Sequence, residues 1–172
     1  MPLHRSSDAL VVAVIAIGMG AAAIIDLRTR RIPNLLTASL AAIGIGIAAA
    51  GLGRVGIGAA ILGCVLGLAF MLPGHIFGAT GAGDVKLLAA AGALLGPADT
   101  LYAFLYTAVA GGALALLVAL SRRRLHKTLG ATARLVKGAA DAASEIEAAT
   151  SDNRFAYAPA IAIGVLVVAL GW

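Results

Sequence analysis

The sequence predicts an all-α integral membrane protein, a six-helix transmembrane bundle in a single domain covering residues 1–172. Hydrophobic residues make up 61% of the chain and charged residues only 12%. The mean hydropathy is +1.00. A chain of this length cannot hide so much apolar surface in one globular core, so it requires a lipid bilayer around it.

Six apolar runs, separated by short polar segments, are the predicted helices. They cover residues 9–25, 35–52, 55–72, 85–95, 101–120 and 157–172. A bilayer core takes about 20 apolar residues, and about 17 are tolerated. Five runs are long enough or nearly so, whereas the fourth is too short. We therefore expect the fourth helix to begin below the membrane surface, where protein or a water-filled cavity must cover the non-helical backbone before it.

The segment 121–156 is the one long polar stretch between predicted helices. Its apolar residues recur at near-helical spacing, which predicts an interfacial helix between the fifth and sixth spans. The basic cluster at residues 122–124 would hold that helix against anionic lipid headgroups. A solvated connector explains the same loose periodicity equally well.

The basic residues predict the orientation of the chain. Of the 13 Lys and Arg residues, 11 fall in segments that lie on one side of the predicted bundle, namely 26–34, 84–87 and 121–156. Arg5 and Arg54 lie on the other side. By the positive-inside rule the basic side is cytoplasmic, so both termini point outward. The net charge of +5 is then a topology signal, and nucleic-acid binding is not indicated because no aromatic residues are interleaved with the basic ones.

The glycines and the single cysteine point to packing. Small residues let transmembrane helices approach closely, and five glycines lie inside apolar runs, at positions 44, 46, 58, 63 and 67. Because Cys64 is the single cysteine of the sequence, an intrachain disulfide and a tetracysteine zinc site are excluded. His75 has no second metal-ligating histidine or cysteine near it in the sequence, so no metal site is expected.

The first segment with candidate catalytic residues runs from Asp26 to Asn34. Pro33 disfavours helix at the residue before it, so the first helix should end near Leu27, and Asn34 can cap the second helix. Asp26 is thereby placed at the cytoplasmic end of the first span. An ordinary surface ion pair with Arg28 or Arg30 is the alternative interpretation.

The second segment is Gly81-Ala82-Gly83-Asp84-Val85-Lys86. Gly81 and Gly83 permit backbone conformations closed to other residues and would let a substrate approach, while Asp84 stands at the start of the short helix. Lys86 could stabilise the charge of the site or meet a substrate carboxylate, although a lysine reaching the interface explains it as well. A role for Asp84 as helix N-cap is the structural alternative. The segment lacks the Gly-Lys-Ser/Thr ending of a phosphate-binding loop.

These two segments, together with residues 157–164 (Tyr-Ala-Pro-Ala-Ile-Ala-Ile-Gly), resemble the type IV prepilin peptidases, which are membrane aspartyl proteases with a Gly-x-Gly-Asp signature. The likeness spans nearly the whole chain. The resemblance implies that Asp26 and Asp84 are the two catalytic aspartates, and that Gly81, Gly83, Lys86 and the residues Arg28, Arg30, Pro33 and Asn34 support the site or bind substrate.

The resemblance also implies removal of the basic leader from pilin precursors at the cytoplasmic face of the bacterial inner membrane. Two carboxylates brought together do not readily both ionise, so one is expected to activate water while the protonated one donates to the scissile carbonyl. The cysteine pairs of larger, methylating relatives are absent, so the chain resembles the short peptidases of tight-adherence (Flp-type) pili. We expect proteolysis without methylation and without a cofactor.

Two other classes of function remain open from the residues alone. An ion-coupled transporter can also use two intramembrane aspartates and a short broken helix. A non-catalytic assembly protein of a secretion system would need neither carboxylate. Substitution of each aspartate separates these possibilities.

Overall fold

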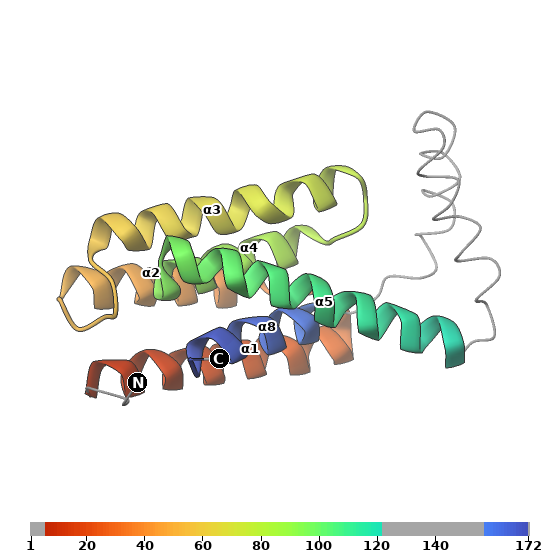
Figure 1. Ribbon diagram of the computed structural model, residues 1–172, viewed down its shortest axis with the longest axis horizontal. Coiled ribbons are helices and arrows are strands. Elements are labelled where there is room, and N and C mark those ends of the chain that lie inside the picture. Colours follow the sequence, from red (N-terminus) through yellow and green to blue (C-terminus); the bar gives the residue numbers. More distant parts are fainter. Residues whose placement is uncertain (1–5, 122–156, 172) are drawn as a thin grey trace.

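The computed structural model describes residues 6–121 and 157–171, and all regular secondary structure in this part of the chain is α-helical. The helices are α1 (Ser6–Thr29), α2 (Asn34–Ala49), α3 (Ile57–Ile76), α4 (Ala82–Leu95), α5 (Pro97–Ser121) and α8 (Ala158–Ala169). Consecutive helices run in alternating directions along one bundle (Figure 1). The connections that follow α1 and α3 therefore lie at the same end, together with the start of α8.

Three of these helices are long and apolar enough to cross a membrane. The candidate spans are Ala9–Thr29, Ile57–Ile76 and Pro97–Leu117, whereas α2 and α8 are shorter apolar helices. Large apolar side chains on the spans face outward, with Ile17 of α1 73% exposed and Val109 of α5 72% exposed. Such surfaces fit contact with lipid chains, so the protein is an α-helical membrane protein. The predicted arrangement of six membrane-crossing segments is only partly matched by these helix lengths.

Backbone geometry moves several predicted boundaries. The second run was expected to reach residue 52, but α2 ends at Ala49, because Gly51 adopts a φ of 69° and terminates the helix. The first helix continues past Leu27 to Thr29 and stops at Arg30, whose φ is 52°. α5 begins four residues before the expected start, at Pro97, since proline is well suited to the first helical position. The predicted interfacial helix in 121–156 falls almost wholly outside the described residues, apart from Ser121, which ends α5.

The short helix α4 is the centre of the bundle. Eleven of its 14 residues are buried, and it packs mainly between α3 and α2. A helix of this length is about 21 Å long and cannot cross a bilayer core of about 30 Å. The prediction that the fourth helix is too short is confirmed. Its burial shows how a short helix is accommodated, because neighbouring helices rather than lipid cover its sides.

Glycines allow the close approach of α3 to α4. A Cβ added to Gly67 would lie 2.6 Å from the carbonyl oxygen of Leu88, and one added to Gly63 would lie 2.8 Å from the carbonyl carbon of Gly96. A Cβ added to Gly44 of α2 would lie 3.1 Å from the Cβ of Ala93. The predicted packing role is thus confirmed for these three glycines. It is wrong for the two that remain, since a Cβ on Gly46 or Gly58 would meet nothing within 4 Å.

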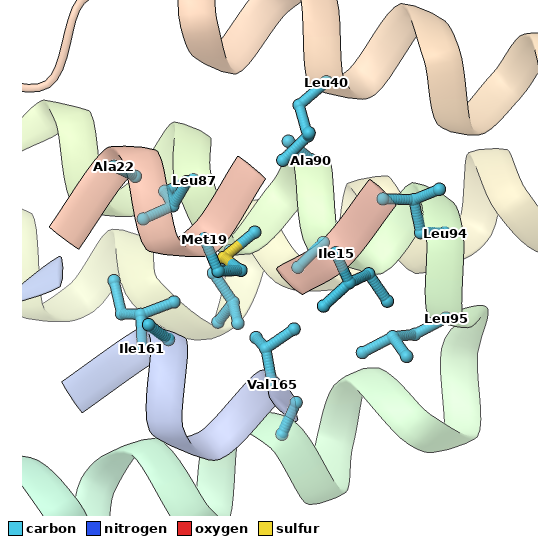
Figure 2. Packing of buried hydrophobic residues seen from close by; sticks show 14 of the residues in the cluster. Ile15, Met19, Ala22, Leu40, Leu87, Ala90, Leu94, Leu95, Ile161 and Val165 are labelled. Atoms are coloured by element: carbon cyan, nitrogen blue, oxygen red, sulfur yellow. The ribbon is translucent and has the colours of Figure 1, made fainter. Parts of the chain in front are cut away.

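The apolar core joins α1, α4 and α8. Figure 2 shows Met19 of α1 lying among side chains from all three helices, with Leu87 of α4 and Ile161 of α8 nearby. These three side chains are fully buried. α1 and α8 also pack directly on each other. The core therefore holds the last turn of α1 and the first turn of α8 beside the start of α4.

Candidate functional site

Asp26 lies in the last turns of α1, and its side chain is buried, with 6% of its surface exposed. Its Oδ2 accepts a hydrogen bond of 3.1 Å from the backbone N–H of Ala158, a residue 132 positions away. Ala158 is the first residue of α8, where backbone N–H groups have no partner within their own helix. The amino terminus of α8 therefore holds one oxygen of Asp26.

Asp84 lies in the first turn of α4 and is 7% exposed. Its Oδ2 accepts a hydrogen bond of 2.9 Å from the N–H of Gly81, while the Gly81 carbonyl oxygen accepts from the Asp84 N–H at 3.0 Å. Gly81 is thus the N-cap residue, and the alternative in which Asp84 itself occupies the cap position is wrong. Asp84 bonds back to the cap from the third helical position and so stays fixed to its own turn.

The fold brings the two aspartates together. Each is buried, both lie at the same end of the bundle, and their carboxylates interact electrostatically. Two acidic side chains placed together in a largely apolar interior destabilise the fold. A pair that is nevertheless present is therefore a candidate functional site. The remaining side chains show how this pair is supported.

Gly81 and Gly83 provide space for neighbouring side chains rather than an unusual backbone conformation. Gly81 has a φ of −77°, which any residue adopts, and Gly83 is not among the described residues with positive φ. A Cβ added to Gly81 would lie 3.1 Å from Oδ2 of Asp84, and one added to Gly83 would lie 3.0 Å from Cβ of Ile32. The expectation of unusual backbone conformations at these glycines is wrong. They let the Asp84 carboxylate and the loop after α1 approach the backbone.

This contact predicts a compensating pair of substitutions. In Gly83→Ala the new methyl group presses on Ile32, which shifts the loop that follows Asp26 relative to Asp84. We expect kcat for the peptide cleavage that the sequence resemblance implies to fall about tenfold. Ile32→Ala in the same chain removes the obstructing side chain and should restore most of that loss. A double-mutant cycle on kcat measures the coupling. Additive losses in the double variant would contradict the contact.

The supporting residues predicted around Asp26 lie on the exposed rim of the site. Arg28, Arg30 and Pro33 are all exposed. Asn34 does not cap α2, since the N-cap residue is Pro33 and Asn34 is the first helical residue. The Asn34 Oδ1 instead accepts a hydrogen bond of 2.9 Å from Nζ of Lys86. This bond joins the start of α2 to the start of α4 across the rim.

Sequence reasoning missed two contributors to the site. Ile32 packs on Gly83, and the Ala158 N–H holds Asp26. Ala158 was noted only as part of a family-like segment. A backbone N–H carries no side-chain signal in a sequence, so only the fold could reveal its role.

The metal-ligating residue types are not gathered in this region. Among residues 6–121 and 157–171, no group of three or more His, Cys, Asp or Glu side chains could hold a metal ion. His75 instead pairs its Nδ1 with the carbonyl oxygen of Thr80 at 3.1 Å, which ties the end of α3 to the loop before α4. The chemical groups that the described residues place at the site are the two carboxylates and the backbone N–H groups that bind them.

Comparison with known proteins agrees with this geometry. A protein-family model described as the type IV leader peptidase family matches residues 13–116, a range that contains both Asp26 and Asp84. Searches of curated proteins and of solved structures return no significant match. The family match covers more than half of the chain, includes both acidic segments and accords with a helical membrane protein, and we conclude that the chain belongs to the type IV leader peptidase family.

Proposed function

We propose that the protein is an aspartyl endopeptidase that removes the basic leader peptide from type IV pilin precursors of the Flp-like kind, without methylating the product. The observation that carries this proposal is the pair of buried, electrostatically interacting carboxylates, Asp26 and Asp84, in a chain of the leader peptidase family. No other pair of acidic side chains in the described residues is buried in this way.

The chemistry follows from what two adjacent carboxyl groups can do. One is ionised and removes a proton from a water molecule, whose oxygen attacks the scissile carbonyl carbon. The other is protonated and donates a hydrogen bond to the carbonyl oxygen as negative charge develops there. The tetrahedral intermediate then collapses, the C–N bond breaks, and a proton passes to the departing amine. Peptide hydrolysis results without a covalent enzyme intermediate.

The backbone hydrogen bonds that hold Asp26 and Asp84 fit this mechanism. Ala158 N–H binds one oxygen of Asp26, and Gly81 N–H binds one oxygen of Asp84, so each carboxyl group keeps a second oxygen for water or substrate. The backbone donors orient both side chains before the substrate arrives. Such preorganisation is a major source of catalytic rate.

Location and orientation are part of the same proposal. The chain would lie in the bacterial inner membrane with six helices embedded in the bilayer, and both termini outside. The basic loop residues Arg28, Arg30 and Arg31 share the end of the bundle that carries the aspartates, which favours a cytoplasmic site. A pilin precursor anchored by its own apolar helix would present its cleavage point at this level.

The test is cleavage by the purified protein. Detergent-solubilised chain is incubated with a pilin precursor that carries a basic leader before its apolar segment, and mass spectrometry identifies the products. We expect two peptides produced by a single cut between leader and apolar segment. A precursor left intact under conditions where a known family member cleaves it would remove the proposal.

Methylation is tested in the same reaction. With S-adenosylmethionine present, we expect the new amino terminus to have the mass of the unmodified peptide. A gain of one methyl group would show that this chain also carries the second activity. Cleavage itself would still support the peptidase assignment.

A further inference from the structure

The peptide unit between Thr80 and Gly81 is hydrogen-bonded on both of its sides. Its N–H belongs to Gly81 and donates to Oδ2 of Asp84 at 2.9 Å. Its carbonyl oxygen belongs to Thr80 and lies 3.1 Å from Nδ1 of His75, in the last turn of α3. A peptide unit is planar, so a bond that fixes its carbonyl group also fixes the direction of its N–H. A single peptide plane thus links His75 to one carboxyl group of the acidic pair.

The His75 ring is the donor in its contact with Thr80. A carbonyl oxygen only accepts hydrogen bonds, so Nδ1 must carry a proton. The neutral ring with its proton on Nδ1 and the cationic ring both meet this requirement. A donor on the carbonyl oxygen also polarises the amide, which makes the N–H on its other side a stronger donor. The bond from His75 therefore orients and strengthens the bond that holds Asp84.

Backbone hydrogen bonds from the end of α3 fix the following chain only as far as the Thr80 N–H. The Ala79 N–H donates to the Gly74 carbonyl oxygen at 2.8 Å, and the Gly78 N–H donates to the His75 carbonyl oxygen at 3.0 Å, with Gly78 at a φ of 72°. These two bonds form a Schellman motif, a common helix ending. The Thr80 N–H also donates to the Gly74 carbonyl oxygen, at 3.1 Å. No backbone N–H of the described residues donates to the Thr80 carbonyl oxygen, which leaves that group to the His75 ring.

The Thr80 side chain packs on the same turn of α3. A Cβ added to Gly74 would lie 3.2 Å from Oγ1 and 3.3 Å from Cγ2 of Thr80, so the missing side chain at Gly74 lets Thr80 approach. The Thr80 hydroxyl group is buried and has no hydrogen-bond partner among the described residues. The side chain of Thr80 therefore contributes its shape to this contact, while its carbonyl group makes the polar link to His75.

The two aspartates are held in different ways. Asp26 accepts from the N–H of Ala158, which is buried in a helix packed on α1. Asp84 accepts from the N–H of Gly81, which is exposed and precedes the first residue of α4. Loop peptides are more mobile than helical ones unless another group binds them. The orientation of Asp84 therefore depends on a contact from outside α4, and His75 makes that contact.

We propose that His75 is a positioning residue of the acidic pair, which orients Asp84 by fixing the peptide unit between Thr80 and Gly81. The inference rests on the proposed peptidase function and adds a residue from outside the two acidic segments. It also gives α3 a second role. Besides packing on α4, the last turn of α3 sets the direction of a catalytic carboxyl group.

Two substitutions of His75 form a matched pair. In His75→Asn the side-chain amide nitrogen takes the place of Nδ1 and can still donate to the Thr80 carbonyl oxygen. In His75→Gln the amide nitrogen takes the place of Nε2, so the bond is lost although the side chain is again a neutral amide. We expect His75→Gln to lower kcat about fivefold with KM within about twofold, and His75→Asn to keep at least about half of the wild-type kcat. Equal kcat values in the two variants, whether lowered or unchanged, would overturn the assignment.

Thr80→Val is the control within the loop itself. It replaces a hydroxyl group that has no partner among the described residues, and it keeps the branched shape and the carbonyl group that His75 binds. We expect wild-type kcat and KM. A loss as large as that of His75→Gln would show that the loop responds to any change, and would overturn a specific role for His75.

Hydrogen exchange tests the same link without catalysis. Wild type and both His75 variants are exchanged in detergent, and mass spectrometry follows the segment 77–84. We expect this segment to exchange about fivefold faster in His75→Gln, because the Gly81 N–H opens more often, and at the wild-type rate in His75→Asn. Equal exchange in wild type and His75→Gln would overturn the inference.

Failure of this inference is distinguishable from failure of the peptidase proposal. Asp84→Asn is measured in the same series. If it abolishes cleavage while His75→Gln cleaves as wild type, only the positioning role is wrong. If wild type does not cleave the precursor, or Asp84→Asn cleaves it normally, the peptidase proposal is wrong, and the exchange rates still decide whether His75 fixes the loop.

Discussion

Asp26→Asn and Asp84→Asn are each expected to lower kcat for precursor cleavage by at least about 1,000-fold. Hydrolysis needs one carboxylate that takes a proton from water and one carboxylic acid that can give a proton up, and an amide can do neither at neutral pH. The effect should be as large for the double variant as for either single one, since the two groups act as a unit. Cleavage of a fluorescently tagged precursor by purified protein measures the rates.

The same substitutions should leave the fold intact. The Asn side-chain oxygen can still accept the hydrogen bond from Ala158 N–H at position 26, or from Gly81 N–H at position 84. Asp99→Asn, in the first turn of α5 at the other end of the bundle, is the matched control and should retain wild-type kcat. A single asparagine variant that keeps substantial cleavage would eliminate the two-carboxylate mechanism, and partial ion transport by such a variant would point to a transporter.

Gly67→Ala is expected to destabilise the protein by about 2–3 kcal/mol and to reduce activity with it. The new Cβ would meet the Leu88 carbonyl oxygen at 2.6 Å and the Ala89 Cα at 2.8 Å, and backbone atoms cannot turn away as a flexible side chain can. α4 must therefore move away from α3. Because Asp84 is in the first turn of α4, that movement also disturbs the site.

Gly58→Ala is the control for this prediction, since it changes a glycine of the same helix where an added Cβ meets nothing within 4 Å. Its stability should equal or slightly exceed that of wild type, as alanine is the better helix former. Thermal unfolding in detergent compares the two variants with wild type. Equal thermal midpoints for Gly67→Ala and Gly58→Ala would show that the α3–α4 crossing has room for a methyl group at Gly67.

Local signals in the sequence predicted the parts of this protein that depend on near neighbours in the chain. Long apolar runs predicted the membrane class. The arginines in alternate loops predict which end faces the cytoplasm, and that orientation stays a prediction. The isolation of Asp26 and Asp84 among apolar residues singled them out before any geometry was known. Boundaries were less certain, because Gly51 and Arg30 end helices through backbone conformations that hydropathy does not register.

The sequence by itself determined that this chain belongs in a bilayer and which two acids stand out, because hydrophobicity and charge are properties of single residues. Only the tertiary structure decided that α4 is buried among its neighbours, that Gly83 packs on Ile32, and that Ala158 bonds to Asp26 across 132 positions. These contacts depend on which helix faces meet, and helix faces of alanine, glycine and leucine are too alike in sequence for their partners to be predicted.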